Sequence, residues 1–181
     1  MPEMLFFRTV QYFLENPYKE AYLRELAKKL KISPFAVKKY ASFLLKEGLI
    51  IEERKGNLRY FKANLASVFY KQIKISFNIQ KILKSKLPDF IQKNIPAVSS
   101  IVLFGSIAKG TDDEKSDIDL LIIGKDKNIS IDYFEDKLNK SINLHIMLWN
   151  EWKRNYKENK AFYYDIIAYG IPLYGELPII K

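Results

Sequence analysis

The apolar positions near the N-terminus recur at the spacing of amphipathic helices. Three segments with this spacing cover residues 3–15, residues 22–30 and the stretch from Ser33 to Gly48, and each predicts a helix. The third segment has clear ends, because a Ser N-cap followed by Pro34 favours a helix start and Gly48 is typical of a helix end.

After Gly48 the pattern changes to that of strands. Residues 49–54 and 58–62 are strand-like runs that flank the turn Lys55-Gly56-Asn57, and this arrangement predicts a β-hairpin. Residues 64–86 return to helical spacing and predict a long connecting helix, which Pro88 would break.

From Pro88 onward strand and helix patterns alternate. A short helix is expected over residues 89–94. Buried-strand runs occupy residues 100–104, 118–123 and 142–148, and helical spacing covers residues 131–140 and 150–169. The alternation predicts an α/β arrangement with a small mixed sheet.

The first half of this order is similar to a known DNA-binding fold. Helix, helix, short turn, helix and hairpin is the order of a winged helix-turn-helix, and residues 3–63 resemble the DNA-binding domain of archaeal and bacterial transcription regulators. The resemblance implies that the helix beginning at Ser33 enters the major groove and that the hairpin forms a wing. The residues then expected to contact nucleic acid are Ser33, Phe35, Lys38, Lys39, Arg54, Lys55, Asn57 and Arg59.

The distribution of charge agrees with a nucleic-acid partner. The 181 residues include 30 Lys and Arg against 21 Asp and Glu, a net charge of +9. Residues 1–86 hold 18 basic and 7 acidic side chains, whereas residues 87–181 hold 12 and 14. A basic half beside a slightly acidic half favours two modules with different partners, DNA or alternatively RNA for the first. The other interpretation is that the lysines only keep the chain soluble and that the first module contacts protein.

One segment of the second half carries candidate chemistry. An apolar strand ends at Phe104, and Gly105-Ser106 turn directly into a short helix; Asp117 and Asp119 then begin the next strand. A Gly at such a turn lets the backbone approach a phosphate, and helix N–H groups favour an anion. A spacing of two places both carboxylates on one face of the strand, where they repel each other unless a cation lies between them. Together these features indicate Mg²⁺ held between protein and nucleotide phosphates.

This order of an apolar strand, Gly-Ser, a spacer and Asp-x-Asp resembles the signature of polymerase-β-like nucleotidyltransferases, in particular their small, minimal members. The resemblance covers about residues 88–175. It implies that Gly105, Ser106 and Lys109 hold the phosphates of an NTP, and that Asp117 and Asp119 bind two catalytic Mg²⁺ ions. The implied reaction transfers a nucleoside monophosphate to an acceptor. For Lys109 the alternative is a solvated lysine of the loop.

The two resemblances together imply an α+β protein in three parts. These are a winged helix domain at residues 1–63, a connecting helix at residues 64–87, and a nucleotidyltransferase-like domain with a small mixed sheet at residues 88–181.

The family's third carboxylate has no counterpart in the sequence. The next strand places Asn143 and His145 on one face, and either is a candidate for that position. Asn143 would be a neutral metal ligand, and His145 a general base, with packing beside the strand as its alternative. Asp112, Asp113 and Glu114 predict a solvated acidic turn, with a ligand from one of them as the alternative.

The residue content excludes several other classes of protein. The absence of Cys excludes a disulfide scaffold, a thiolate zinc site and a thiol nucleophile, and a single His excludes clustered His sites. No apolar run approaches the roughly 18 residues of a membrane span, and the acidic N-terminus is unlike a signal peptide. We therefore expect a cytoplasmic protein without a membrane segment.

Two functions remain open. In the first, the chain is a Mg²⁺-dependent nucleotidyltransferase whose basic domain brings the acceptor near. In the second, it is a DNA-binding transcription regulator, antitoxin-like in one version, whose degenerate nucleotidyltransferase domain only binds nucleotide or a partner. The Gly-Ser and Asp-x-Asp set favours the first, and the absent third carboxylate favours the second. Further partners expected are a second copy through the connecting helix and, by resemblance only, a small helical protein.

Overall fold

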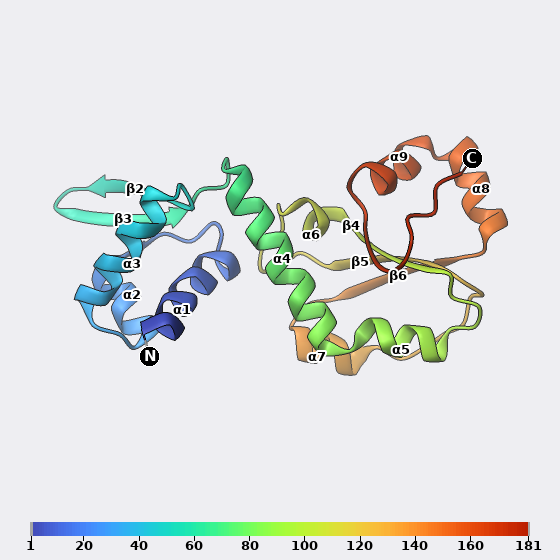
Figure 1. The fold of residues 1–181 in the computed structure, drawn as a ribbon, viewed down its shortest axis with the longest axis horizontal. Helices are drawn as coiled ribbons and strands as arrows, with labels where there is room; N and C mark the ends of the chain where they lie inside the picture. The colour runs from blue at the N-terminus through green and yellow to red at the C-terminus, as the bar shows by residue number, and fades with distance from the viewer. Residues whose placement is uncertain (1, 181) are drawn as a thin grey trace. The chain divides into compact units, whose positions relative to one another are not determined.

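The chain forms two compact units. The computed structural model describes residues 2–180, and the division between the units falls at Lys74, so that the first is Met1–Lys74 and the second is Ile75–Lys181. Figure 1 labels the elements of both units except β1 and β7. No helix among the described residues is both long enough and apolar enough to span a bilayer.

The first unit combines three helices with a three-stranded antiparallel sheet. Its elements are α1 (Pro2–Glu15), β1 (Ala21–Tyr22), α2 (Leu23–Leu30), α3 (Pro34–Lys46), β2 (Ile50–Lys55) and β3 (Leu58–Ala63). The strand order is β1-β3-β2. Leu26, Val37 and Phe61 are fully buried at its centre, so one helix stripe each from α2 and α3 and one face of β3 share a core.

The predicted start of the third helix is confirmed, and the helix ends at Lys46, two residues before Gly48. The Ser33 hydroxyl accepts a hydrogen bond from the Ala36 N–H at 3.2 Å, and Pro34 occupies the first turn. The predicted hairpin is also confirmed. In the β2–β3 pair, Ile50 lies opposite Ala63 at one end and Lys55 lies opposite Leu58 at the other. The second helix was expected to begin at Tyr22, which is wrong by one residue, because Ala21 and Tyr22 pair with Phe61 and Tyr60 as a short strand.

A long helix, α4 (Val68–Ser85), is followed at once by α5 (Leu87–Asn94). The long helix does end in this region, but the expectation that Pro88 causes the break is wrong. The break lies at Lys86, whose φ of 72° is left-handed, and Pro88 is part of the first turn of α5, where a proline costs no hydrogen bond.

The second unit is built on a small mixed sheet, as predicted, and this sheet has four strands. Its remaining elements are β4 (Ser100–Phe104), α6 (Gly105–Lys109), β5 (Ile118–Ile123), α7 (Asp132–Leu138), β6 (Ile142–Met147), α8 (Trp149–Glu158), α9 (Lys160–Tyr169) and β7 (Ile171–Gly175). The strand order is β6-β5-β4-β7. Among the strands within residues 2–180, only the β5–β6 pair is parallel, and α7 is the crossover that a parallel pair requires.

Helices cover both faces of this sheet (Figure 1). Alternate residues of β4 and β5 point to opposite sides: Leu103 and Leu120 pack with α5 and α7, whereas Val102 and Leu121 pack with α8 and α9. Because β4 and β5 are buried on both faces, their sequences are continuous apolar runs.

The helical stretch expected over residues 150–169 is two helices. The chain breaks at Asn159, whose φ and ψ of −130° and 64° are not helical. The Asn159 side chain accepts a hydrogen bond from the Phe162 N–H at 3.3 Å and so caps α9. Helical periodicity alone continues across such a break and does not show it.

Candidate functional site

The turn after β4 brings a glycine directly against a carboxylate. Gly105 opens α6 with a φ of 73°, and a Cβ placed on it would overlap Oδ2 of Asp119. Phe104 and Asp119 are register partners in the β4–β5 ladder, so the carboxylate stands beside the start of α6. Only glycine accepts both the left-handed φ and this close approach.

The next residue of the turn offers a free donor. Ser106 is half-buried, and among residues 2–180 its hydroxyl has no hydrogen-bond partner. Its carbonyl accepts from the Thr111 N–H at 3.0 Å, which closes the loop after α6. The hydroxyl is therefore available to an anion.

Asn143 joins the two aspartates into one group. It is the register partner of Asp119 in the parallel β5–β6 pair. Its Nδ2 donates to Oδ1 of Asp119 at 2.9 Å and to Oδ2 of Asp117 at 3.3 Å. The amide thus offsets part of the repulsion between two carboxylates that face the same way.

The donor set of this group fits a divalent cation of the Mg²⁺ type. Mg²⁺ prefers carboxylate and carbonyl oxygens and is held in many sites by one or two carboxylates together with phosphates. Asp117, Asp119 and the Asn143 amide oxygen provide such donors. Within residues 2–180 no third His, Cys, Asp or Glu completes a cluster with the two aspartates, so the site carries one negative charge fewer than a three-carboxylate site.

His145 lies on the same face of β6 as Asn143, two residues further on. Its ring is 5.2 Å from the ring of Phe104 and 6.0 Å from that of Phe162, centroid to centroid. The residue stays exposed. The ring therefore has two aromatic neighbours and remains exposed to solvent.

Lys109 is engaged by α9. Its Nζ is 2.5 Å from Oδ1 of Asp165 and 5.1 Å from the centre of the Tyr169 ring. A role at a phosphate would require Lys109 to leave Asp165 or to share its charge with it.

The acidic turn before Asp117 was expected to be solvated. This expectation is wrong for Asp112 and Asp113, which are held by hydrogen bonds. Asp112 is only 3% exposed and accepts from Asn78 Nδ2 at 3.0 Å. Asp113 accepts from the Lys115 N–H at 2.9 Å and from the Ser116 hydroxyl at 3.0 Å. The backbone hydrogen bond from Lys115 is the main cause that holds the pKa of Asp113 below its ordinary value. Glu114 is exposed.

Sequence reasoning missed Lys140. This half-buried lysine donates from Nζ to the carbonyl of Asp113 at 2.7 Å and to that of Ser116 at 2.8 Å. Burial lowers the pKa of the Lys140 ammonium from its ordinary value, although Asp112, Asp113 and Asp117 each act to raise it. Nothing in the local sequence distinguishes this lysine from its neighbours, because its partners lie on a loop more than 20 residues earlier.

The residues expected to contact nucleic acid on α3 are exposed. Phe35 is 78% exposed, and Lys38 and Lys39 point to solvent. Neither lysine has an ion-pair partner among residues 2–180. Ser33 uses its hydroxyl as the helix cap.

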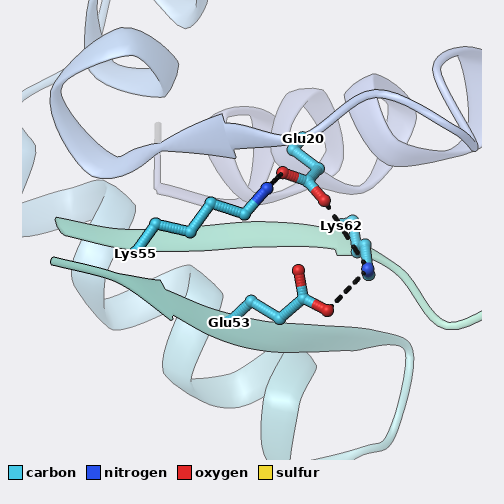
Figure 2. Close-up of polar contacts among 4 residues, drawn as sticks. All are labelled: Glu20, Glu53, Lys55 and Lys62. Atoms are coloured by element: carbon cyan, nitrogen blue, oxygen red, sulfur yellow. Dashed lines mark hydrogen bonds and ion pairs between the residues drawn. The ribbon is translucent and has the colours of Figure 1, made fainter.

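The cations of the hairpin are mostly neutralised by acidic neighbours, which the sequence did not indicate. Arg59 binds both carboxylate oxygens of Glu52. Figure 2 shows Lys55 paired with Glu20, and Lys62 shared between Glu20 and Glu53. The hydrogen bond from Lys55 is the main cause that keeps the pKa of Glu20 below its ordinary value. Arg54 and Asn57 are exposed at the same hairpin.

The second unit identifies the class of protein. The sequence profile of the nucleotidyltransferase domain matches residues 78–171, which include the Gly-Ser turn, both aspartates and Asn143. The chain belongs to this family.

A relative and two solved structures extend the comparison. A protein of Methanocaldococcus jannaschii, provisionally named a protein adenylyltransferase, is 30% identical over 102 residues, which are 54% of this chain and 99% of that protein. A toxin–antitoxin complex crystallised with AMP-PNP has a chain 24% identical, with 55% of this chain and 74% of that chain covered and a TM-score of 0.38. A mutant of the MntA–HpeT toxin–antitoxin complex has a chain that is 21% identical, with 54% of this chain and 73% of that chain covered and a TM-score of 0.37.

Proposed function

We propose that the chain transfers a nucleoside monophosphate from an NTP to a hydroxyl group of an acceptor. One observation carries this proposal: Asp117, Asp119 and Asn143 converge beside the Gly105–Ser106 turn, joined by hydrogen bonds of 2.9 and 3.3 Å. This arrangement supports a phosphate site and a divalent-cation site that are adjacent.

In this function each residue of the group has its own role. Gly105 leaves room for the backbone to approach phosphate oxygens, and Ser106 donates its hydroxyl to one of them. Asp117 and Asp119 hold Mg²⁺, with Asn143 as a neutral third ligand. Bound Mg²⁺ neutralises charge on the phosphates and orients them. Lys109 adds a positive charge at the rim of the site.

The bond changes are those of an in-line displacement. The acceptor oxygen forms a bond to the α-phosphorus, the bond from that phosphorus to the β-phosphate oxygen breaks, and pyrophosphate leaves. The acceptor hydroxyl loses its proton, for which exposed His145 is our candidate base.

For the acceptor we propose a protein hydroxyl. The Methanocaldococcus jannaschii relative is 30% identical along almost its whole length and bears the name of a protein adenylyltransferase. By that analogy ATP is the NTP, and the modified side chain belongs to a protein partner.

For the first unit we propose a winged helix domain that binds DNA. The order α1-β1-α2-α3-β2-β3 with the β1-β3-β2 sheet is the order of that fold. Lys38 and Lys39, which have no ion-pair partner among the described residues, support a nucleic-acid face on α3, with Phe35 beside them. The ion pairs of the hairpin reduce what Lys55 and Arg59 can contribute to it.

A second function is favoured by Asn143. A neutral residue at the third metal position weakens the cation site, so the domain would bind nucleotide or a partner protein without turnover, and the chain would act as a DNA-binding regulator. The two functions share the nucleotide site and differ in catalysis.

The test is calorimetric titration of the four NTPs in the presence of Mg²⁺, followed by incubation with labelled ATP and candidate acceptors. Wild type is expected to bind at least one NTP, and Asp119→Asn is expected not to. Asp126→Asn, a change at an exposed loop aspartate of the same unit, is the matched control and should bind as wild type does. Binding without any transfer would favour the regulator, and no Mg²⁺-dependent binding would end both proposals for this site.

A further inference from the structure

We propose that Lys140 is a positioning residue that sets where the Asp117 carboxylate stands relative to Asp119. The inference rests on the proposed function of this carboxylate pair. It concerns a lysine that lies outside the Gly-Ser and Asp-x-Asp motif, and it assigns that lysine a role in metal and nucleotide binding.

Lys140 contacts both ends of the turn that precedes Asp117. Its Nζ donates to the Asp113 carbonyl at 2.7 Å and to the Ser116 carbonyl at 2.8 Å. Ser116 is the residue directly before Asp117, so the second bond fixes the peptide group that joins the two residues. A charged donor makes stronger hydrogen bonds to carbonyls than a neutral one does.

The turn before Asp117 is closed by its own hydrogen bonds. The Asp113 N–H donates to the Ser116 hydroxyl at 2.9 Å, and that hydroxyl donates back to Asp113 Oδ1 at 3.0 Å. The Lys115 N–H donates to the same carboxylate at 2.9 Å. Since the turn is closed in itself, its orientation toward the sheet depends on the groups that hold it from outside, and Lys140 supplies two of those bonds.

Lys140 is itself well placed for this role. It follows Asn139, the left-handed residue that ends α7, and its neighbour Ser141 accepts a hydrogen bond from the Ile118 N–H at 2.8 Å. The residues on both sides of Asp117 are therefore tied to the same short connection between α7 and β6. That connection leads directly to Asn143. One segment of chain therefore carries the proposed third ligand, Asn143, and also the lysine that supports Asp117.

The positive charge of Lys140, like its hydrogen bonds, favours the observed position of Asp117. Its ammonium interacts electrostatically with Asp112, Asp113 and Asp117, and an opposite charge nearby lowers the repulsion that would otherwise drive adjacent carboxylates apart. The ammonium also opposes a bound cation. We expect the loss of position to outweigh this effect, because the hydrogen bonds are direct and the ammonium has no hydrogen bond to Asp117 within residues 2–180.

The experiment compares Lys140→Met with Lys137→Met in the full chain. Lys137 is a lysine of α7 whose Nζ also donates to a backbone carbonyl, that of Ser85 at 3.1 Å, away from the carboxylates. Three quantities are measured: the dissociation constant of Mn²⁺ as a probe of the metal site, the exchange rates of the backbone amides of residues 115–118, and the midpoint of thermal unfolding.

We expect the Mn²⁺ dissociation constant to rise roughly tenfold or more in Lys140→Met, as is usual when the support of a metal ligand is removed. Amide exchange should accelerate at residues 115–118 in the same variant. Lys137→Met should change neither quantity, and Lys140→Arg should restore much of the Mn²⁺ affinity because its guanidinium can still donate to both carbonyls.

Several results would overturn the proposal. Unchanged or tighter Mn²⁺ binding by Lys140→Met, with unchanged amide exchange, would show that the turn holds its position without the lysine. An equal loss of Mn²⁺ binding in Lys137→Met would assign the effect to general stability. If wild type itself binds no Mn²⁺, the proposed function of the pair fails, and the exchange rates alone then decide whether Lys140 holds the turn.

Discussion

In the proposed function, Asn143 is the residue that would decide how strongly the candidate site holds a cation. Its amide nitrogen donates to both aspartates, which stabilises the pair without metal. When a cation binds, the same side chain has to present its oxygen, a weaker ligand than a carboxylate. The residue therefore favours the metal-free state more than an aspartate at this position would.

This gives a prediction for Asn143→Asp. A third carboxylate should tighten Mg²⁺ binding by about tenfold or more, because each tenfold corresponds to only about 1.4 kcal/mol of added attraction. Without metal the variant should be less stable than wild type, since it loses two hydrogen bonds worth about 1 kcal/mol each and adds repulsion. Calorimetry with Mg²⁺ and thermal unfolding with and without Mg²⁺ measure the two effects.

Asn143→Leu is the control for this prediction, because it removes the hydrogen bonds and adds no charge. It should lose stability in the absence of Mg²⁺ and gain no affinity. Equal Mg²⁺ affinities for the aspartate variant and wild type would mean that Asn143 does not face the bound cation.

At the scale of single residues, the sequence predicted the members of the motif and not their surroundings. Gly105, Ser106 and the aspartates follow from a spacing within one segment, where a strand period of two is enough to place both carboxylates together. Lys140 and the pairing of Lys109 with Asp165 depend on contacts across 24 to 56 residues of chain. No local pattern encodes such contacts.

At the scale of elements, the charge of the first unit is distributed unequally. On the hairpin, Glu20, Glu52 and Glu53 neutralise Lys55, Arg59 and Lys62. The lysines of α3 have no such partners among the described residues. Of these two elements, α3 would therefore attract a nucleic acid more strongly than the hairpin.

We accordingly expect Lys38→Ala with Lys39→Ala to weaken DNA binding and to flatten its dependence on salt. Loss of two phosphate contacts should reduce the slope of log affinity against log salt concentration by about 2. Lys125→Ala with Lys127→Ala, at exposed positions of the second unit, is the control. Titrations of duplex DNA at several salt concentrations provide the slopes, and an unchanged slope would move the DNA-binding surface away from α3.

The elements themselves were predictable wherever an apolar period lasts for several residues. In the second unit β4, β5 and β6 were predicted instead as continuous apolar runs, whereas the helices of the first unit satisfy this condition. The strand Ala21–Tyr22 does not, since two residues have no period and gain their structure only by pairing with Phe61 and Tyr60. The break at Asn159 was missed because the apolar spacing continues from α8 into α9.

At the scale of the whole molecule, the two candidate sites lie in separate compact units. Phe35, Lys38 and Lys39 belong to Met1–Lys74, and the carboxylates belong to Ile75–Lys181. Each unit has a core of its own. Damage to one site should therefore leave the other site intact.

We predict that Asp119→Asn abolishes Mg²⁺-dependent NTP binding and leaves the affinity for DNA as in wild type. Conversely, the double substitution of Lys38 and Lys39 should leave NTP binding unchanged. Both affinities are measured for both variants, together with thermal unfolding. A loss of DNA binding in Asp119→Asn, with normal unfolding, would show that the two sites are coupled.

The contact between Gly105 and Asp119 has a genetic consequence. Every change at the first or second base of a glycine codon creates a side chain or stops translation, and any side chain at Gly105 collides with the carboxylate it should accompany. In a library of random variants selected for nucleotide binding, position 105 should therefore keep only synonymous codons. Neighbouring Ser106, which contributes a hydroxyl, should still accept threonine.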